Sequence, residues 1–225
     1  MDFRSYAQNF SNSGTNLVIA VPAGVVDGDL LVCVITHGTN SANTMNTHAS
    51  WNSPFVGNNG DQNVRVYTRY ASSEPANYTF TSTTSNQMHG VIVAISDPHP
   101  TLAINAEHYE LLTTAAASKT NNVTTTADNC LLLFIVTTDT ADVTEVFSWS
   151  VSMTERWDLN QSSTFLQHAG ATEIVTTQTN YSRVATKTGA NRRIFGALLA
   201  IRPPDAGGGG DPLPMAMDQY RRRRQ

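Results

Sequence analysis

Charged side chains, cysteines and long apolar runs are all scarce in this sequence. Only 14% of its 225 residues are charged, whereas about 25% is usual for a soluble domain. The longest apolar run, Leu131 to Val136, is far shorter than the roughly 18 residues that a membrane-spanning helix needs. The opening MDFRSYAQNF lacks the apolar centre of a secretory signal peptide. We therefore expect no membrane span, and synthesis in a cytoplasm without export by the general secretory route.

Recognisable catalytic and metal-binding patterns are also missing. Cys33 and Cys130 lie within apolar strand segments and not in a CxxC pair, which predicts two buried free thiols. The six histidines do not occur at zinc-ligand spacing, and there is no nucleophile-elbow serine, P-loop or dinucleotide fingerprint. The scattered acidic residues neither support nor exclude the facing carboxylates of a glycosidase. The sequence thus predicts no catalytic residue, no metal and no cofactor, in a protein that is not an enzyme.

Threonine, serine and asparagine replace the missing charge, and these residues favour strands and turns. Short apolar or alternating segments recur between clusters of Gly, Asn, Asp and Pro, which predicts an all-β protein. Segments such as LLVCVI are apolar throughout and are expected at the centre of the fold. The expected strands are Leu17–Val21, Asp29–Ile35, Val64–Ala71, Tyr78–Thr81, Val91–Ile95, Leu102–Tyr109, Cys130–Thr137, Thr164–Ala171, Arg183–Thr186 and Ile194–Ile201.

The two halves of the sequence contain similar elements in the same order, roughly one hundred residues apart. The first half reads VVDGD, LLVCVI, Trp51, VRVYTRYA, YTFT and GVIVAI. The second reads TTADN, CLLLFIV, Trp149 and Trp157, TFLQHAGA, YSRVAT and GALLAI. Identity is low, so the halves are either a duplication or two similar sets of strands. Two such halves predict an antiparallel two-sheet β-sandwich of the jelly-roll kind over residues 1–204.

A polar stretch from Thr36 to Asn63 interrupts the strand pattern. It is long for a loop in a compact domain, and such loops often bind a partner. The candidate surface-binding residues of this loop are His48, Trp51 and Phe55.

The strand that follows this stretch alternates, which predicts one buried and one solvated face. On the face expected to be solvated lie Arg65, Tyr67 and Arg69. Stacking and charge would allow this row to bind a sugar or phosphate. A solvated or inter-subunit sheet face is the commoner reason for such a row.

The last 21 residues, 205–225, predict an extended C-terminal arm. Gly207–Gly210 form a flexible hinge, and the segment after them is too short to fold alone but suits docking on a partner. The arm carries +1, which leaves −5 on residues 1–204 (−4 minus +1). Four arginines behind an apolar segment suit a protein partner better than nucleic acid. The expected partner-binding residues are Leu213, Met215, Met217, Tyr220, Arg221, Arg222, Arg223 and Arg224.

Several of these segments together resemble a domain that recurs among structural proteins of tailed bacteriophages. In that family a GD turn, here Gly28-Asp29 within VPAGVVDGDLLVCVI, leads into the first core strand. A segment like Ala71-Ser72-Ser73-Glu74-Pro75 followed by Tyr78-Thr79-Phe80 joins two later strands, and GVIVAISDPHP and LLAIRPP resemble the strand ends. The resemblance covers most of residues 15–204. The Thr36–Asn63 stretch and the arm depart from it.

The resemblance implies a jelly-roll-like building block of a virion, made in the host bacterial cytoplasm. It implies other virion proteins as partners, such as the major capsid or tail proteins, and assembly as a homo-oligomer. Because the chain has no long shaft or repeat, we prefer a capsid decoration (cement) protein tethered through its arm. The alternatives are a tail fibre or tail accessory protein and a host-surface carbohydrate-binding module. A glycan hydrolase is a third and more distant hypothesis.

Overall fold

The computed structural model describes residues 1–38, 44–139, 144–150, 152–161 and 166–205, and all of the regular structure in them is β-strand. Every pairing between these strands is antiparallel. The prediction of an all-β antiparallel sandwich is therefore confirmed. No helix in the described ranges is long and apolar enough to cross a membrane.

The first half of the chain forms a small two-layer sandwich, which we call the N module. Its main sheet has the order β1-β7-β3-β5-β4, and β2 pairs with β6 in a separate sheet. The strands are β1 (Asp2–Ser11), β2 (Asn16–Ala20), β3 (Leu30–His37), β4 (Asn52–Asn58), β5 (Asn63–Tyr70), β6 (Asn77–Thr81) and β7 (Met88–Ser96).

The second half repeats this plan as the C module. Its main sheet has the order β8-β15-β10-β13-β12, and the outer sheet has the order β9-β14-β11. Matching β8, β9 and β10 to β1, β2 and β3, and β12–β15 to β4–β7, reproduces the strand order of the N module, which agrees with the repeat in the sequence. Among the described strands, β11 has no counterpart in the N module. The strands are β8 (Ile104–Leu111), β9 (Ser118–Thr124), β10 (Cys130–Asp139), β11 (Phe147–Trp149), β12 (Thr154–Gln161), β13 (Leu166–Val175), β14 (Asn180–Lys187) and β15 (Ile194–Ile201).

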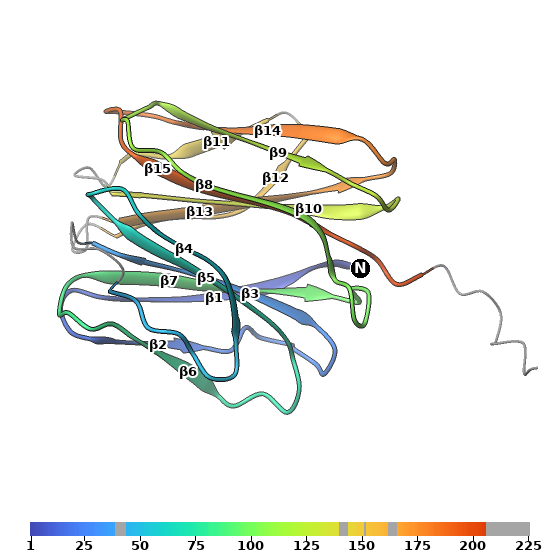
Figure 1. The fold of residues 1–225 in the computed structure, drawn as a ribbon, viewed down its shortest axis with the longest axis horizontal. Helices are drawn as coiled ribbons and strands as arrows, with labels where there is room; N and C mark the ends of the chain where they lie inside the picture. The colour runs from blue at the N-terminus through green and yellow to red at the C-terminus, as the bar shows by residue number, and fades with distance from the viewer. Residues whose placement is uncertain (39–43, 140–143, 151, 162–165, 206–225) are drawn as a thin grey trace, which may run out of the picture.

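The two modules pack through their five-stranded sheets, so four sheets are stacked where a two-sheet sandwich was predicted (Figure 1). Both faces of each central strand are consequently covered. On β3, Leu30, Val32 and Val34 face the other module, whereas Leu31, Cys33 and Ile35 face the β2–β6 sheet. This double burial explains why LLVCVI is apolar without a break.

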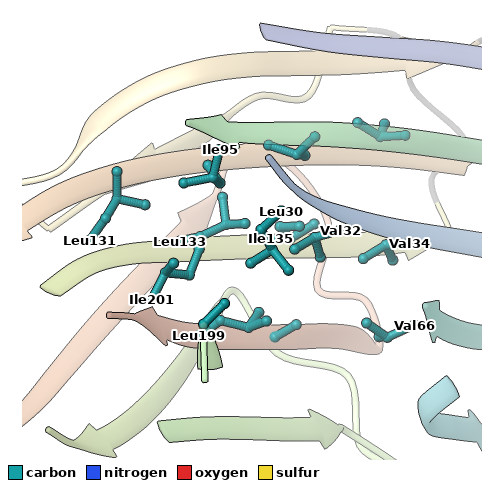
Figure 2. Packing of buried hydrophobic residues seen from close by; sticks show 14 of the residues in the cluster. Leu30, Val32, Val34, Val66, Ile95, Leu131, Leu133, Ile135, Leu199 and Ile201 are labelled. Carbon is teal, nitrogen blue, oxygen red and sulfur yellow. The ribbon is translucent and has the colours of Figure 1, made fainter. Parts of the chain in front are cut away.

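We call the layer between the modules the seam. Figure 2 shows it as a continuous apolar core to which equivalent strands of both modules contribute. Leu30 and Leu131 are equivalent residues at the starts of β3 and β10, and both point into it. The modules therefore meet through the same face, as the two subunits of a twofold dimer would. The labelled residues of the seam are Leu30, Val32, Val34, Val66, Ile95, Leu131, Leu133, Ile135, Leu199 and Ile201.

Equivalent glycines open space for the outer sheet of each module. A Cβ added to Gly90 would lie 2.6 Å from Ile19 Cδ1, and one added to Gly196 would lie 2.7 Å from Asn121 Oδ1. The two modules thus share the backbone arrangement at this point, although the side chains over the glycine are apolar in the N module and polar in the C module. These side chains are Leu17 and Ile19 over Gly90, and Lys119 and Asn121 over Gly196.

The polar stretch Thr36–Asn63 is not one long loop, because β4 lies inside it and pairs with β5. The sequence pattern does not predict β4, because Pro54 and Gly57 interrupt the alternation of the segment NSPFVGN. Strand β4 is at the edge of its sheet, where a proline is tolerated since one side of the strand makes no ladder bonds. The remaining connection is residues 38–51, of which 39–43 lie outside the described residues.

Candidate functional site

The last strand, β15, fixes the point from which the arm leaves the body. It lies inside its sheet and pairs on one side with β10, from Ile194–Thr138 to Ile201–Leu131. On the other side it pairs with β8, from Phe195–Leu111 to Ile201–Ile104. The chain after it is therefore attached to a strand that is hydrogen-bonded along both edges.

Hydrogen bonds continue past the end of β15 and hold the chain as far as Asp205. Arg202 N donates to Ala103 O at 2.7 Å, and His99 N donates to Arg202 O at 2.8 Å. His99 Nε2 lies 3.3 Å from Asp205 Oδ2, and Arg202 also pairs with Asp205. The hydrogen bond from His99, with help from Arg202, lowers the pKa of Asp205. We call His99, Arg202 and Asp205 the clasp.

Two equivalent turns flank the clasp, and both need a left-handed residue. Gly28 has φ 93° in the turn before β3, and Asn129 has φ 54° in the turn before β10. Glycine and asparagine are the residues that adopt this conformation most readily. The first turn is also fixed by Asp29, which pairs with Arg4 at 2.7 Å and accepts a hydrogen bond from Val26 N at 3.1 Å.

Between the first turn and the clasp lies a hollow of about 410 Å³, which we call the arm-end groove. Pro204 forms one wall of it and also lines a second hollow beside the turn before β10. The groove thus adjoins the base of the arm and combines apolar with acidic side chains. It is lined by Val26, Asp27, Gly28, Asp29, Tyr70, Asp97, Pro98, Pro100 and Pro204.

The structure does not bring His48, Trp51 and Phe55 together on one surface. Trp51 is only 6% exposed and packs edge-on against Tyr78, with ring centroids 5.1 Å apart. His48 lies beside the same cluster, 5.2 Å from the Phe80 ring. Phe55 faces the seam instead and stacks on Tyr109 at 5.5 Å. This arrangement gives Trp51 and Phe55 packing roles and leaves little of Trp51 for a ligand.

The row Arg65, Tyr67 and Arg69 lies on a covered face, so the prediction of a solvated face was wrong. Tyr67 is fully buried, and its hydroxyl donates to Asn46 O at 2.6 Å. Arg65 donates to Met45 O at 2.5 Å. Arg69 pairs with Glu74 at 3.0 Å. The sequence pattern failed here because the segment after β3 folds over this face.

Burial raises the pKa of the Tyr67 hydroxyl, in keeping with its closed surroundings.

Both cysteines are free and buried, as predicted. Within the described ranges, no three His, Cys, Asp or Glu side chains are grouped as metal ligands would be. The predicted arm residues, from Leu213 to Arg224, lie outside the described residues.

Two buried histidines meet across the seam, which the sequence did not indicate. The rings of His89 on β7 and His168 on β13 lie 4.4 Å apart between centroids, and neither residue is exposed. His89 Nδ1 is 3.3 Å from Leu166 O, and its Nε2 is 3.2 Å from Gln8 Oε1. Neither ring nitrogen of His168 has a hydrogen-bond partner among the described residues. Burial lowers the pKa of His89 to about 4 and that of His168 well below its usual value.

The position of Trp51 leads to a stability prediction. We expect Trp51→Phe to lower the free energy of unfolding by about 1 to 2 kcal/mol, because the smaller ring leaves a cavity in the cluster with Tyr67 and Tyr78. Urea unfolding measures this, with the exposed residue Val56 (Val56→Ala) as the control. A stability unchanged by Trp51→Phe, combined with lost binding on a glycan array, would instead support a carbohydrate-binding edge at this loop.

The clasp and the arm-end groove were not predicted as a site, although their parts were visible in the sequence. The resemblance includes the turn at Gly28-Asp29 and the strand end at Asp97-Pro98, but their meeting with Pro203-Pro204 depends on how the modules pack. Searches of family models, of curated proteins and of solved structures find no match to this chain.

Proposed function

We propose that this chain is a non-enzymatic structural protein of a bacteriophage particle, tethered to other virion proteins by its C-terminal arm. The preferred position is the capsid surface, as a decoration (cement) protein. The resemblance of the GD turn and the Ala71–Pro75 segment to the phage structural domain supports the class of protein.

The observation that carries the tether is the attachment of the arm to an interior strand. Separating β15 from the body requires both ladders, to β10 and to β8, to break. An edge strand is held by one ladder only. A C-terminus fixed in this way suits a segment that must bear load.

The closed packing of the body supports a role as a rigid building block. Three apolar layers run through the four sheets, and the central strands β3, β7, β10 and β15 are buried on both faces. A body of this kind keeps its shape under load because its interior is close-packed. In this proposal the arm binds the neighbouring protein, and the body is the rigid part of the building block.

We expect deletion of residues 206–225 to abolish incorporation into particles while the body folds normally. The deletion keeps Asp205, because this residue is bonded to His99 and Arg202. The measurement is quantitative immunoblotting of purified particles from cells that produce the phage, with the full chain as reference. Incorporation of the shortened chain at the level of the full chain would contradict the tether.

A scrambled arm of the same composition provides the matched control. It keeps the length and the charge of residues 206–225 but separates the apolar residues from Arg221–Arg224. If docking depends on their order, the scrambled arm also fails to incorporate. Incorporation through the scrambled arm would indicate a general charge attraction in place of a specific dock.

A further inference from the structure

The arm-end groove carries exposed apolar surface next to the base of the arm. Val26, on its rim, is 55% exposed, and Leu102, in an adjoining hollow that shares Tyr70, is 59% exposed. No other large apolar side chain in the described ranges is as exposed as these two. These two side chains, beside hollows that share Tyr70, offer apolar surface for a contact.

The charge of this end is opposite to that of the segment beyond it. The arm-end groove, the hollow beside the turn before β10 and the ion pairs of Asp29 and Asp205 together contain five aspartates and two arginines, a net charge of −3. Residues 206–225 contain four arginines and two aspartates, a net of +2. The arm also has an apolar run, Leu213 to Met217, for which the groove offers proline and valine walls. The charged residues of this end are Asp27, Asp29, Asp97, Asp128, Asp205, Arg4 and Arg202.

We propose that the arm of one copy docks in the arm-end groove of a second copy. This inference rests on the proposed function, because it names the acceptor of the arm as another subunit. Leu213 to Met217 occupies the apolar part of the groove, and Arg221–Arg224 pairs with Asp27 and Asp97. Both aspartates are exposed in the monomer.

The described chain leaves the body on the side where a second copy facing the same end would lie. The last described residues leave the body outward, on the right in Figure 1. Pro203 and Pro204 stiffen this exit, because proline fixes φ and favours an extended backbone. Leu213 is eight positions beyond Asp205, a distance of at most about 26 to 29 Å when the chain is extended. If the segment continues outward, this length is available to bridge to a second copy that faces the same end.

The position of groove and arm at one end also determines the symmetry. When two copies face each other through these ends, each arm reaches the other copy's groove, and both contacts form at once. Such an exchange is closed and twofold, whereas a groove at the opposite end would generate open chains. The expected assembly is therefore an arm-exchanged dimer.

The first test is the oligomeric state of the purified full-length chain, measured by light scattering across a range of concentrations. The full chain forms a dimer, and deletion of residues 206–225 leaves a monomer. Asp27→Asn combined with Asp97→Asn raises the dimer Kd about tenfold, since exposed ion pairs contribute modestly. Asparagine at position 27 keeps the oxygen that accepts from Ser73 N, so the turn is preserved.

The matched control removes two carboxylates from elsewhere on the body. Glu107→Gln with Glu155→Gln makes the same change in charge at exposed positions outside the groove. This variant keeps the dimer Kd of the full chain. A dimer that survives deletion of residues 206–225, or one weakened equally by both double variants, overturns the proposal. Equal thermal transitions of all variants show that folding is not the cause.

The second test distinguishes the two copies by disulfide trapping. A chain with Val26→Cys is mixed with a chain carrying Met215→Cys and oxidised; the native Cys33 and Cys130 are buried. The proposal predicts a disulfide between the two different chains. When both substitutions are in one chain, a purely intramolecular disulfide would show that the arm docks on its own body and would overturn the exchange.

The two proposals fail in different ways. If the arm is required for incorporation into particles but the purified chain stays monomeric, the acceptor is another virion protein and only the exchange is wrong. If the chain forms the arm-exchanged dimer but never appears on particles, the dimer holds and the virion role is wrong.

Discussion

Replacement of Gly170 by valine will destabilise the protein by about 3 kcal/mol, at the upper end of the usual cost of overpacking a core. Gly170 on β13 lies under the indole of its cross-strand neighbour Trp157, and an added Cβ would be 2.2 Å from Trp157 Cη2. The indole cannot move aside easily. It is 3% exposed and packs across the seam against Tyr6, with ring centroids 5.3 Å apart. Urea unfolding at neutral pH measures the loss.

A double-mutant cycle with Trp157→Ala tests the cause of this loss. Trp157→Ala alone removes a large buried ring and should cost about 3 to 5 kcal/mol. In that background Gly170→Val should cost little or even stabilise, because the clash is gone and valine favours a strand. If the two substitutions lower the free energy of unfolding additively, the cost of Gly170→Val does not come from a clash with Trp157. Strong coupling would show that the fit of Trp157 over Gly170 helps to hold the modules together.

Acidification from pH 6.5 to pH 4 will remove about 3 kcal/mol of stability through His89 alone. Burial between the modules lowers the pKa of His89 to about 4. In this range the unfolded chain therefore binds a proton that the folded chain does not, and the free energy of unfolding falls as the pH falls. Full stability is present above about pH 6.5 and is lost progressively toward pH 4.

Neighbouring groups add to this effect or offset part of it. His168 contributes in the same direction, because burial and the adjacent His89 lower its pKa. Burial raises the pKa of Asp139 and of Asp158. These carboxyls bind a proton more readily in the folded state, which offsets part of the loss near pH 4. The polar groups against His89, Leu166 O and Gln8 Oε1, carry no charge to stabilise an imidazolium.

The measurement is urea unfolding at a series of pH values between 7 and 4. The double variant His89→Gln/His168→Leu should flatten the profile, because both titrating groups of the seam are gone. His108→Gln, on strand β8, leaves the buried pair in place and should keep the slope of the parent chain. A double variant with the parent's slope would show that the acid sensitivity arises elsewhere.

The strands with the clearest signal in the sequence are those of the interior. All ten expected strands overlap an observed one, and the apolar segments LLVCVI, GVIVAI, CLLLFIV and FGALLAI became β3, β7, β10 and β15. Burial on both faces requires apolar residues at every position, so these strands were visible without structural knowledge. The repeat of segments in the sequence corresponds to the repeat of strand order in the two modules, because each segment keeps its place in its module.

The missed strands belong to edges and outer sheets. Strands β1, β4, β11 and β12 are each at the edge of a sheet, and β9 is an outer strand that carries Lys119 and Asn121 at buried positions. A strand that is covered on one side only, or that buries polar groups, shows no clear apolar alternation. The stacking of four sheets was equally hidden, because a sequence pattern indicates that a face is buried but not what covers it.

The candidate site was predictable in its parts only. The sequence shows the GD turn at Gly28, the segment GVIVAISDPHP and the unusual composition of the arm. Their assembly into one end of the molecule requires β7 and β15 to end together, which follows from the packing of the two modules. Trp51 shows the opposite case. An aromatic residue in a polar stretch resembled a binding residue, but the neighbouring rings of Tyr67, Tyr78 and Phe80 bury it.

Electron microscopy of purified particles carrying a labelled copy of the chain tests the virion role most directly. An epitope inserted in the exposed turn at residues 12–15 lies next to Ser11 and Met88, whereas the clasp lies beyond Ser96 at the other end of β7. The label therefore leaves the arm and its groove untouched. A tethered decoration protein predicts regular labelling of the capsid surface, which is lost on deletion of residues 206–225. Particles without label, with all of the labelled chain recovered as free protein, would contradict it.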